Sequence, residues 1–328
     1  MAHLMLYKDI GIDNEATYGS SNLGTARRMH VTSVGLGQDV TKELVEDTMV
    51  SPKGRERMIS KRNVVEGEIA GYGEVRTLKE MFELVNGVAG TSVAHGDTGA
   101  ITTFWQNTDG TFKSKAINID RNNSQEKFNG VVAKSMSLSF SDDILESSVD
   151  CVAQARASGT SMTNILGATV EPFTFADMTV TIHQGATYGG QAVTQYVSDF
   201  SLEYANGIEG SYLSGSKSIK RVDPKVPELN GSLKIFHEGS SWIEASYGAS
   251  EFYIRLEGTL PSEGGLIGGV TPYLLRIDIP RCELTTNVRA YEQAEFSVEE
   301  IEFVGMADTS LNGVSALWRP QLTTGINI

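Results

Sequence analysis

The chain has 328 residues, of which 40% are hydrophobic and 21% are charged, a balance that excludes wholesale disorder. Its 41 acidic and 27 basic side chains leave a net charge of −14, which argues against a surface that grips nucleic-acid phosphates. No apolar run approaches the ~20 residues of a membrane-spanning helix, and the N-terminus lacks the apolar core of a signal peptide.

The first long segment without a strand pattern covers residues 37–62, and its charges are acidic first and basic later. A loop of this length inside a compact domain is uncommon unless it is functional or disordered. We expect a loop that contacts a neighbouring subunit, and a solvated flexible hairpin is the alternative. The side chains expected to make this contact are Asp39, Lys42, Glu43, Glu46, Asp47, Lys53, Arg55, Arg57, Lys61 and Arg62.

One convincing helix follows, over residues 77–87. Thr77 is expected to cap its start, and Gly87 to end it in a left-handed conformation. A shorter counterpart is expected at residues 240–248. The apolar stripe of the first helix consists of Leu78, Met81, Phe82 and Val85.

Alternation of period two dominates the rest of the chain, for example in residues 136–140, 177–182 and 273–279. Strands with one apolar and one polar face belong to antiparallel sheets that bury one side. The sequence therefore predicts a mainly β fold, with two tandem antiparallel β-sandwich units, each flanked by a short helix.

A second segment without a strand pattern covers residues 204–227. It has an early acidic residue followed by a basic run, as residues 37–62 do on a larger scale. We expect it to be the second unit's counterpart of the first loop. Its basic side chains are Lys217, Lys220, Arg221 and Lys225.

The two long segments belong to a wider internal repeat. Residues 31–36 return as 197–202, 66–69 as 230–233 and 116–120 as 276–280, in order and about 160 residues apart. We expect a first unit with an N-terminal arm at residues 1–155 and a linker at 156–171. A second unit is expected at residues 172–306 and a C-terminal arm at 307–328.

No arrangement of residues supports catalysis or a cofactor. Ser161, His95 and Asp97 lie in motifs that echo the subtilisin-like proteases, but the order and spacing are wrong for that triad. The five histidines are scattered, so no metal site is expected. Cys151 and Cys282 lie in different units and are expected to be buried thiols rather than a disulfide.

The order of the pieces resembles the tail tube (major tail) proteins of long-tailed bacteriophages. Three stretches carry the likeness, namely residues 128–140, residues 173–182 with 197–209, and residues 273–280. The resemblance implies a structural, non-enzymatic virion protein whose inner sheets join into a multi-subunit β-barrel tube. It implies stacked rings, with the segments at residues 37–62 and 204–227 reaching the adjacent ring. It also implies other tail proteins at the tube ends, and duplex DNA passing through without specific binding. Assembly in the host cytoplasm and a place in the virion tail follow.

The duplication predicts how many chains form a ring. If single-unit relatives use six units, three two-unit chains supply the same six, in a trimer that looks sixfold; rings of six chains are the alternative. The acidic balance predicts a lumen that repels DNA.

The rival function is a β-sandwich adhesion or carbohydrate-binding module, which calls for an exposed aromatic platform. The three tryptophans, Trp105, Trp242 and Trp318, are far apart in the sequence.

Overall fold

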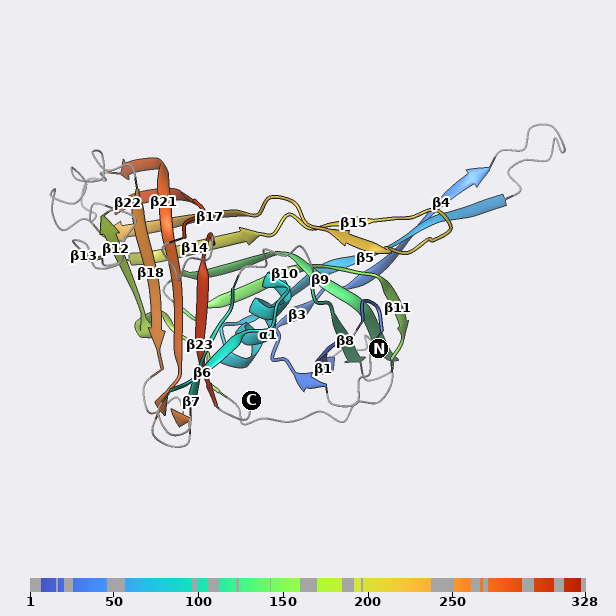
Figure 1. Ribbon diagram of the computed structural model, residues 1–328, viewed down its shortest axis with the longest axis horizontal. Helices are drawn as coiled ribbons and strands as arrows, with labels where there is room; N and C mark the ends of the chain where they lie inside the picture. Colours follow the sequence, from blue (N-terminus) through green and yellow to red (C-terminus); the bar gives the residue numbers. More distant parts are fainter. Residues whose placement is uncertain are drawn as a thin grey trace, which may run out of the picture.

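The computed structural model describes residues 7–15, 17–20, 26–45, 57–95, 99–105, 112–121, 124–141, 143–159, 170–184, 192–195, 197–236, 251–260, 266–267, 271–290, 298–309 and 316–325. Over these residues the protein is mainly β, with large antiparallel sheets and one α-helix (Figure 1). The predicted antiparallel β-sandwich class is confirmed. No helix in this part of the chain is long and apolar enough to cross a membrane.

The strands of the first half are β1 (Tyr7–Asn14), β2 (Arg27–Arg28), β3 (Ser33–Val34), β4 (Gly37–Val45), β5 (Arg57–Tyr72), β6 (Thr91–His95), β7 (Gly99–Thr103), β8 (Lys115–Arg121), β9 (Ser124–Ser141), β10 (Glu146–Ala153) and β11 (Ala155–Ser158). Most of them form two sheets, whereas β6 and β7 pair with each other and, through β7, with β23 (Arg319–Gly325) of the second half. One sheet has the order β2–β1–β8–β9–β11. The other has the order β4–β5–β10–β9, with β3 also beside β5. The first part of β9 belongs to one sheet and its second part to the other.

The strands of the second half repeat this arrangement. They are β12 (Met178–Gln184), β13 (Ala192–Gln195), β14 (Val197–Ala205), β15 (Glu209–Ser211), β16 (Arg221–Asp223), β17 (Glu228–Phe236), β18 (Phe252–Thr259), β19 (Leu266–Ile267), β20 (Thr271–Pro272), β21 (Leu274–Ala290), β22 (Val298–Gly305) and β23 (Arg319–Gly325). Their two main sheets have the orders β13–β12–β18–β21–β23 and β14–β17–β22–β21, and β15 with β16 and β19 with β20 form two-stranded sheets of their own. Long strand β21 thus corresponds to β9.

The two long strands match in detail as well as in order. Each has a β-bulge at the equivalent point, between Ala133 and Ser135 in β9 and between Leu284 and Thr286 in β21. The topology corrects one sequence match: residues 116–120 lie in β8, whose counterpart is β18, whereas residues 276–280 lie in β21. Short alternating segments fit many strands equally well, so this match was out of register.

The two halves join into one continuous sheet, which we call the shared sheet. Strand β9 pairs antiparallel with β14, with Leu138 opposite Leu202, and this gives the order β4–β5–β10–β9–β14–β17–β22–β21. The rings of Phe140 and Phe200 stack across the junction with centroids 5.5 Å apart. Burying one apolar face of this sheet holds the two halves together.

The C-terminal strand also connects the halves. β23 pairs with β21 of the second half on one side and with β7 of the first half on the other. Gln321 Nε2 donates a hydrogen bond to Thr103 Oγ1 at 3.0 Å, and the fully buried Trp318 stacks on Tyr204 with centroids 4.7 Å apart. The Trp318 ring also meets Phe82 of the helix, with centroids 5.6 Å apart. Part of the segment expected as a C-terminal arm is therefore built into the fold.

The predicted helix is present as α1 (Val75–Asn86), and Gly87 follows it in the left-handed conformation with φ 65°. The start differs from the prediction, because the helix begins at Val75 and Thr77 is not its cap. Instead the Thr77 hydroxyl donates to the His30 carbonyl at 3.1 Å and accepts from the His30 N–H at 3.2 Å. The Thr77 hydroxyl therefore makes tertiary hydrogen bonds to the His30 backbone instead of the capping bond that the sequence predicted. The counterpart expected at residues 240–248 lies outside the described residues.

Helix α1 is buried on nearly all sides, including charged positions. Glu80 and Glu83 both accept from the buried ammonium of Lys115 on β8, the latter at 2.7 Å, and Arg27 lies 2.9 Å from Glu80. Burial alone would raise the pKa of Glu80, but the charges of Lys115 and Arg27 hold it below its usual value. These pairs fix α1 against β8 and β2.

The first of the two segments expected as long loops is strand wherever the structure describes it, and the second contains a short hairpin. Residues 37–62 include β4 and part of β5. These two strands form a hairpin in which Gly37 lies opposite Glu66 at one end and Val45 lies opposite Arg57 at the other. Residues 204–227 include the smaller hairpin of β15 and β16. Apolar–polar alternation did not predict these strands, because strands that project from a core need no apolar face. Residues 155–158, at the start of the expected linker, form β11.

Candidate functional site

The shared sheet has two chemically different faces. The face toward the core carries apolar side chains such as Met136, Leu138 and Leu202, each at most 2% exposed. The opposite face carries serines and carboxylates, and we call it the polar face. On it the hydroxyls of Ser137 and Ser148 lie 2.8 Å apart, and those of Ser201 and Ser232 lie 2.7 Å apart. A serine-rich alternating strand predicted this surface in β9, and the register extends it across both halves.

The polar face is strongly acidic. Leaving aside the part of β4 and β5 that precedes Glu66 in β5 and follows Gly37 in β4, ten carboxylates and two lysines reach it, so its net charge there is −8. Lys134 lies 2.7 Å from Glu66, and Lys234 lies 3.6 Å from Asp199, so both lysines are already paired. The carboxylates of this face are Glu66, Glu68, Glu146, Asp150, Asp199, Glu203, Glu228, Glu283, Glu300 and Glu302. A surface of this charge repels phosphate rather than binding it.

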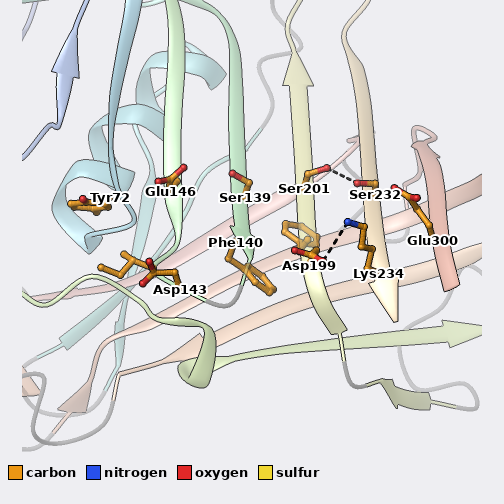
Figure 2. Close-up of a pocket in the computed structure, with 12 residues that line it drawn as sticks. Tyr72, Ser139, Phe140, Asp143, Glu146, Asp199, Ser201, Ser232, Lys234 and Glu300 are labelled. Atoms are coloured by element: carbon orange, nitrogen blue, oxygen red, sulfur yellow. Dashed lines mark hydrogen bonds and ion pairs between the residues drawn. The ribbon is translucent and has the colours of Figure 1, made fainter. Parts of the chain in front are cut away.

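A groove lies at one end of the polar face, where the strands meet the loop before β10 (Figure 2). Its volume is about 500 Å³, and we call it the rim groove. Phe140 and Phe200 also line it, although their side chains are only 4% and 2% exposed, and Tyr72 at its side is 45% exposed. The charged residues that line it are Asp143, Glu146, Asp199, Lys234 and Glu300.

The shared sheet ends in two open edges. Among the described residues, β3 and β4 pair only with β5, and the second part of β21 pairs only with β22. An open strand edge presents unpaired N–H and C=O groups, which favour pairing with another chain. The two edges are equivalent to β14 and to the second part of β9, which pair with each other inside the chain.

The expected contact residues of the first loop are placed as follows. Asp39, Lys42 and Glu43 lie on β4, and Arg57, Lys61 and Arg62 lie on β5. Pairing of β4 with β5 brings the acidic and basic stretches side by side in one hairpin, which we call the first hairpin. It projects from the body of the molecule, as Figure 1 shows. Glu46, Asp47, Lys53 and Arg55 lie outside the described residues.

The second-unit residues lie beside the first hairpin. Lys217, Lys220, Arg221 and Lys225 are all exposed, on or next to the hairpin of residues 206–227, which we call the second hairpin. The Asn63 N–H donates to the Lys217 carbonyl at 2.9 Å, and the Arg62 guanidinium lies 4.9 Å from the Tyr212 ring centroid. The structure therefore brings the two predicted sets of residues together at the end of the shared sheet opposite the rim groove.

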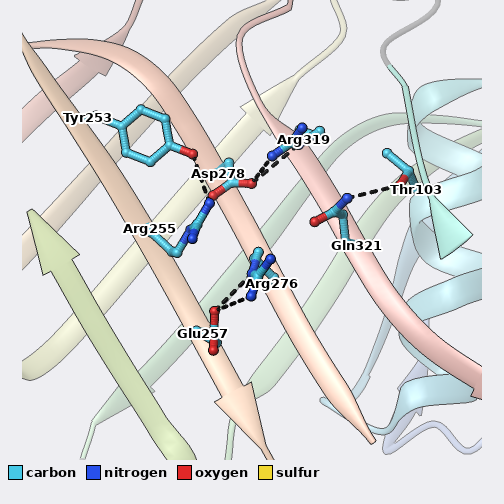
Figure 3. Close-up of polar contacts among 8 residues, drawn as sticks. All are labelled: Thr103, Tyr253, Arg255, Glu257, Arg276, Asp278, Arg319 and Gln321. Carbon is cyan, nitrogen blue, oxygen red and sulfur yellow. Dashed lines mark hydrogen bonds and ion pairs between the residues drawn. The ribbon is translucent and has the colours of Figure 1, made fainter. Parts of the chain in front are cut away.

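A buried ionic network fixes the C-terminal strand (Figure 3). Asp278 on β21 is fully buried and accepts from Arg255 Nε of β18 at 2.6 Å and from Arg319 Nη2 of β23 at 2.5 Å. Burial alone would raise the pKa of Asp278, but these hydrogen bonds outweigh it and hold the pKa below its usual value. Sequence reasoning missed this network, because its three residues are brought together only by strand register.

The two cysteines are free and buried, as predicted. Burial raises the pKa of Cys151 to about 12 and raises that of Cys282 as well. Neither thiol is therefore reactive at neutral pH.

Two comparisons with known proteins bear on this surface. A search of curated proteins finds no significant match. A family model described as "Phage tail tube protein" matches residues 9–304, which include the shared sheet, both hairpins and helix α1. Since this match covers most of the 328 residues, the chain belongs to the phage tail tube protein family and is a structural component of a virion tail.

Proposed function

We propose that the chain closes into rings that stack into the hollow tail tube through which phage DNA passes, and that it has no enzymatic role. The observation that carries this proposal is the shared sheet, which combines two open edges with one buried face and one acidic, serine-rich face. Such a sheet can close only by joining other copies. The polar face would then line the bore.

The junction inside the chain is a template for the junction between chains. Because β21 corresponds to β9 and β3/β4 to β14, the second part of β21 would pair with β3/β4 of the next copy. Ser137 lies opposite Glu203 within the chain, and the residues equivalent to them are Val288 and Gly37. Val288 of one chain would therefore lie opposite Gly37 of the next chain. Internal and external junctions would alternate around the ring.

Strand number favours three chains. Each copy contributes eight strand positions to the shared sheet, so three copies supply 24. At about 4.8 Å between strands this gives a barrel roughly 40 Å across between backbones, which leaves a bore for duplex DNA once side chains are subtracted. Six chains with both halves in the barrel would double the width. We therefore propose a trimer with pseudo-sixfold symmetry, built from units at residues 1–155 and 172–306.

A crosslinking experiment tests the ring and its size. In the variant Gly37→Cys with Val288→Cys, assembled tubes should form disulfides between chains under mild oxidation. Gly37 has room for the new side chain, since its Cβ would meet only the Gly35 carbonyl oxygen, at 3.9 Å. Products on a non-reducing gel should end at three chains of 35.5 kDa, and native mass spectrometry of single rings should give the same mass.

The matched control pairs Gly37→Cys with Arg289→Cys, which is one position along the strand and points to the other face. It should crosslink far less. Hollow filaments in electron micrographs without the Gly37–Val288 disulfide would refute the proposed edge, and products up to six chains would refute the trimer.

The acidic polar face predicts that assembled tubes do not bind duplex DNA at low salt. The variant Glu203→Lys should acquire DNA binding that weakens steeply as salt rises, because it places a ring of lysines in the bore. Glu171→Lys makes the same charge change at an exposed position outside the shared sheet and should bind no more than the unmodified tubes. Tight, salt-dependent binding by unmodified tubes would contradict an acidic bore.

The rival function needs an exposed aromatic platform. Trp318 is 1% exposed, Trp105 is partly buried, and Trp242 lies outside the described residues. The placement of Trp318 in the core favours the tube over a carbohydrate-binding module. Assembly in the host cytoplasm and contacts with other tail proteins at the tube ends are further parts of the proposal.

A further inference from the structure

Strand register arranges part of the rim groove as a row of side chains across the polar face. Tyr72 of β5 lies opposite Glu146 of β10, and Glu146 lies opposite Ser139 of β9. The row continues through Ser201 of β14 and Ser232 of β17. All five residues line the groove. The groove therefore runs across the strands and crosses the junction between the two halves of the chain.

The two ends of the row are acidic, and its middle carries hydroxyls. At one end the exposed carboxylates of Asp143 and Glu146 accompany the Tyr72 ring, as Figure 2 shows. At the other end Glu300 of β22, the strand beside β17, lines the groove. Within the described part of the chain, no cationic side chain forms an ion pair with any of these three carboxylates. They are therefore free to bind a positively charged ligand.

The spacing of the row favours a long cation over a compact one. Strands β9, β14 and β17 separate Glu146 from Glu300, so at about 4.8 Å per strand their backbones lie roughly 19 Å apart. Two carboxylates at this separation do not hold one metal ion. They suit a flexible chain with an ammonium group at each end, and the serine hydroxyls between them can accept hydrogen bonds from inner amines.

The size and charge of the groove also fit such a chain. Its volume of about 500 Å³ lies within the range of small-molecule pockets. Four carboxylates and one lysine line it, so the charge of the lining is −3. The lysine, Lys234, lies 3.6 Å from Asp199 and is already paired. The exposed ring of Tyr72 adds a surface that attracts an ammonium group and packs against methylene groups.

We propose that the rim groove binds a linear polyamine that lies across the strands. One terminal ammonium contacts the Tyr72 ring and the Glu146 carboxylate, the inner amines donate to the serine hydroxyls of the row, and the other terminus approaches Glu300. The site lies within one chain, so binding does not depend on ring closure or stacking. The polar face, which repels phosphate, would thus take up an organic cation at a defined place.

Calorimetric titration of the full chain with spermine, a linear tetraamine, tests the site. At physiological salt, which screens attraction to the overall negative charge, we expect saturable binding at one site per chain. The variant Glu146→Gln should bind at least about tenfold more weakly, because it removes the charge beside the Tyr72 ring. The control Glu203→Gln removes the same charge from an exposed position of the polar face outside the groove, and should change the affinity less than about twofold.

A second pair of variants predicts the opposite direction. Lys234→Gln should strengthen spermine binding, because it removes the one cation that lines the groove. Lys134→Gln removes a paired lysine of the same face outside the groove and should leave the affinity unchanged. Spermine should also bind more tightly than putrescine, a shorter diamine, or Mg²⁺, because neither of these reaches both ends of the row.

Several results would overturn the site. These are no spermine binding by the unmodified chain, equal weakening in the two glutamate variants, or Mg²⁺ binding as tight as that of spermine. Circular dichroism should show that each variant is folded, since the substituted side chains lie on the polar face and not in the core. Failure of the polyamine site would leave the proposed tube untouched, because ring formation is measured separately by crosslinking and electron microscopy.

Discussion

Replacement of Asp278 by Asn is expected to lower the free energy of unfolding by about 3–5 kcal/mol, because it leaves two guanidinium groups beside a buried neutral amide. Arg255 and Arg319 are only 11% and 15% exposed and both donate to this carboxylate. Urea unfolding at pH 7, followed by circular dichroism, measures the change.

The same network predicts an acid sensitivity. Since the pKa of Asp278 is lower in the folded chain than in the unfolded chain, its contribution to stability is present above about pH 4 and is lost as the pH falls through the folded-state value. The Asn variant should therefore lose less stability than the unmodified chain between pH 5 and pH 3, as approximate limits of this window.

The matched control is Glu257→Gln, two register positions along the same pair of strands. Glu257 accepts from Arg276 Nε at 2.8 Å, but both side chains are about a third exposed. Removing this pair should cost about 1 kcal/mol or less. Equal losses in the two variants would show that the buried network does not hold β23 in place.

Shortening the first hairpin is expected to abolish tube formation while leaving the fold intact. Replacing residues 41–58 with a tight turn removes the far end of the pairing between β4 and β5, which projects from the body. Thr41 and Lys42, where the turn would begin, are exposed, so the shortened chain should remain folded. Electron microscopy should show rings without filaments.

A control for this deletion is the unmodified hairpin carrying Lys42→Ala, which keeps the length and removes one charge. It should still give filaments. Filaments of unchanged ring spacing from the shortened chain would show that the first hairpin does not connect rings.

The candidate surface was predicted in part. Alternation in residues 136–140 correctly separated a buried side from a serine side, and the charge of −14 correctly suggested an acidic surface. The acidic residues of that surface come from six strands, however, and only the pairing of β9 with β14 places them on one face. The rim groove had no sequence signal, because its lining comes from five separate segments of the chain.

The sequence alone determined the local features of this protein, because local features depend on neighbours a few residues apart. Gly87 ended the predicted helix, period-two alternation predicted the strands, and the internal matches revealed a repeat. The tertiary structure alone decided which strands pair. Alternation says which side chains share a face but carries no information about the partner strand. The junction of β9 with β14, the insertion of β23 between the halves and the contact of the first hairpin with the second therefore depend on the tertiary structure.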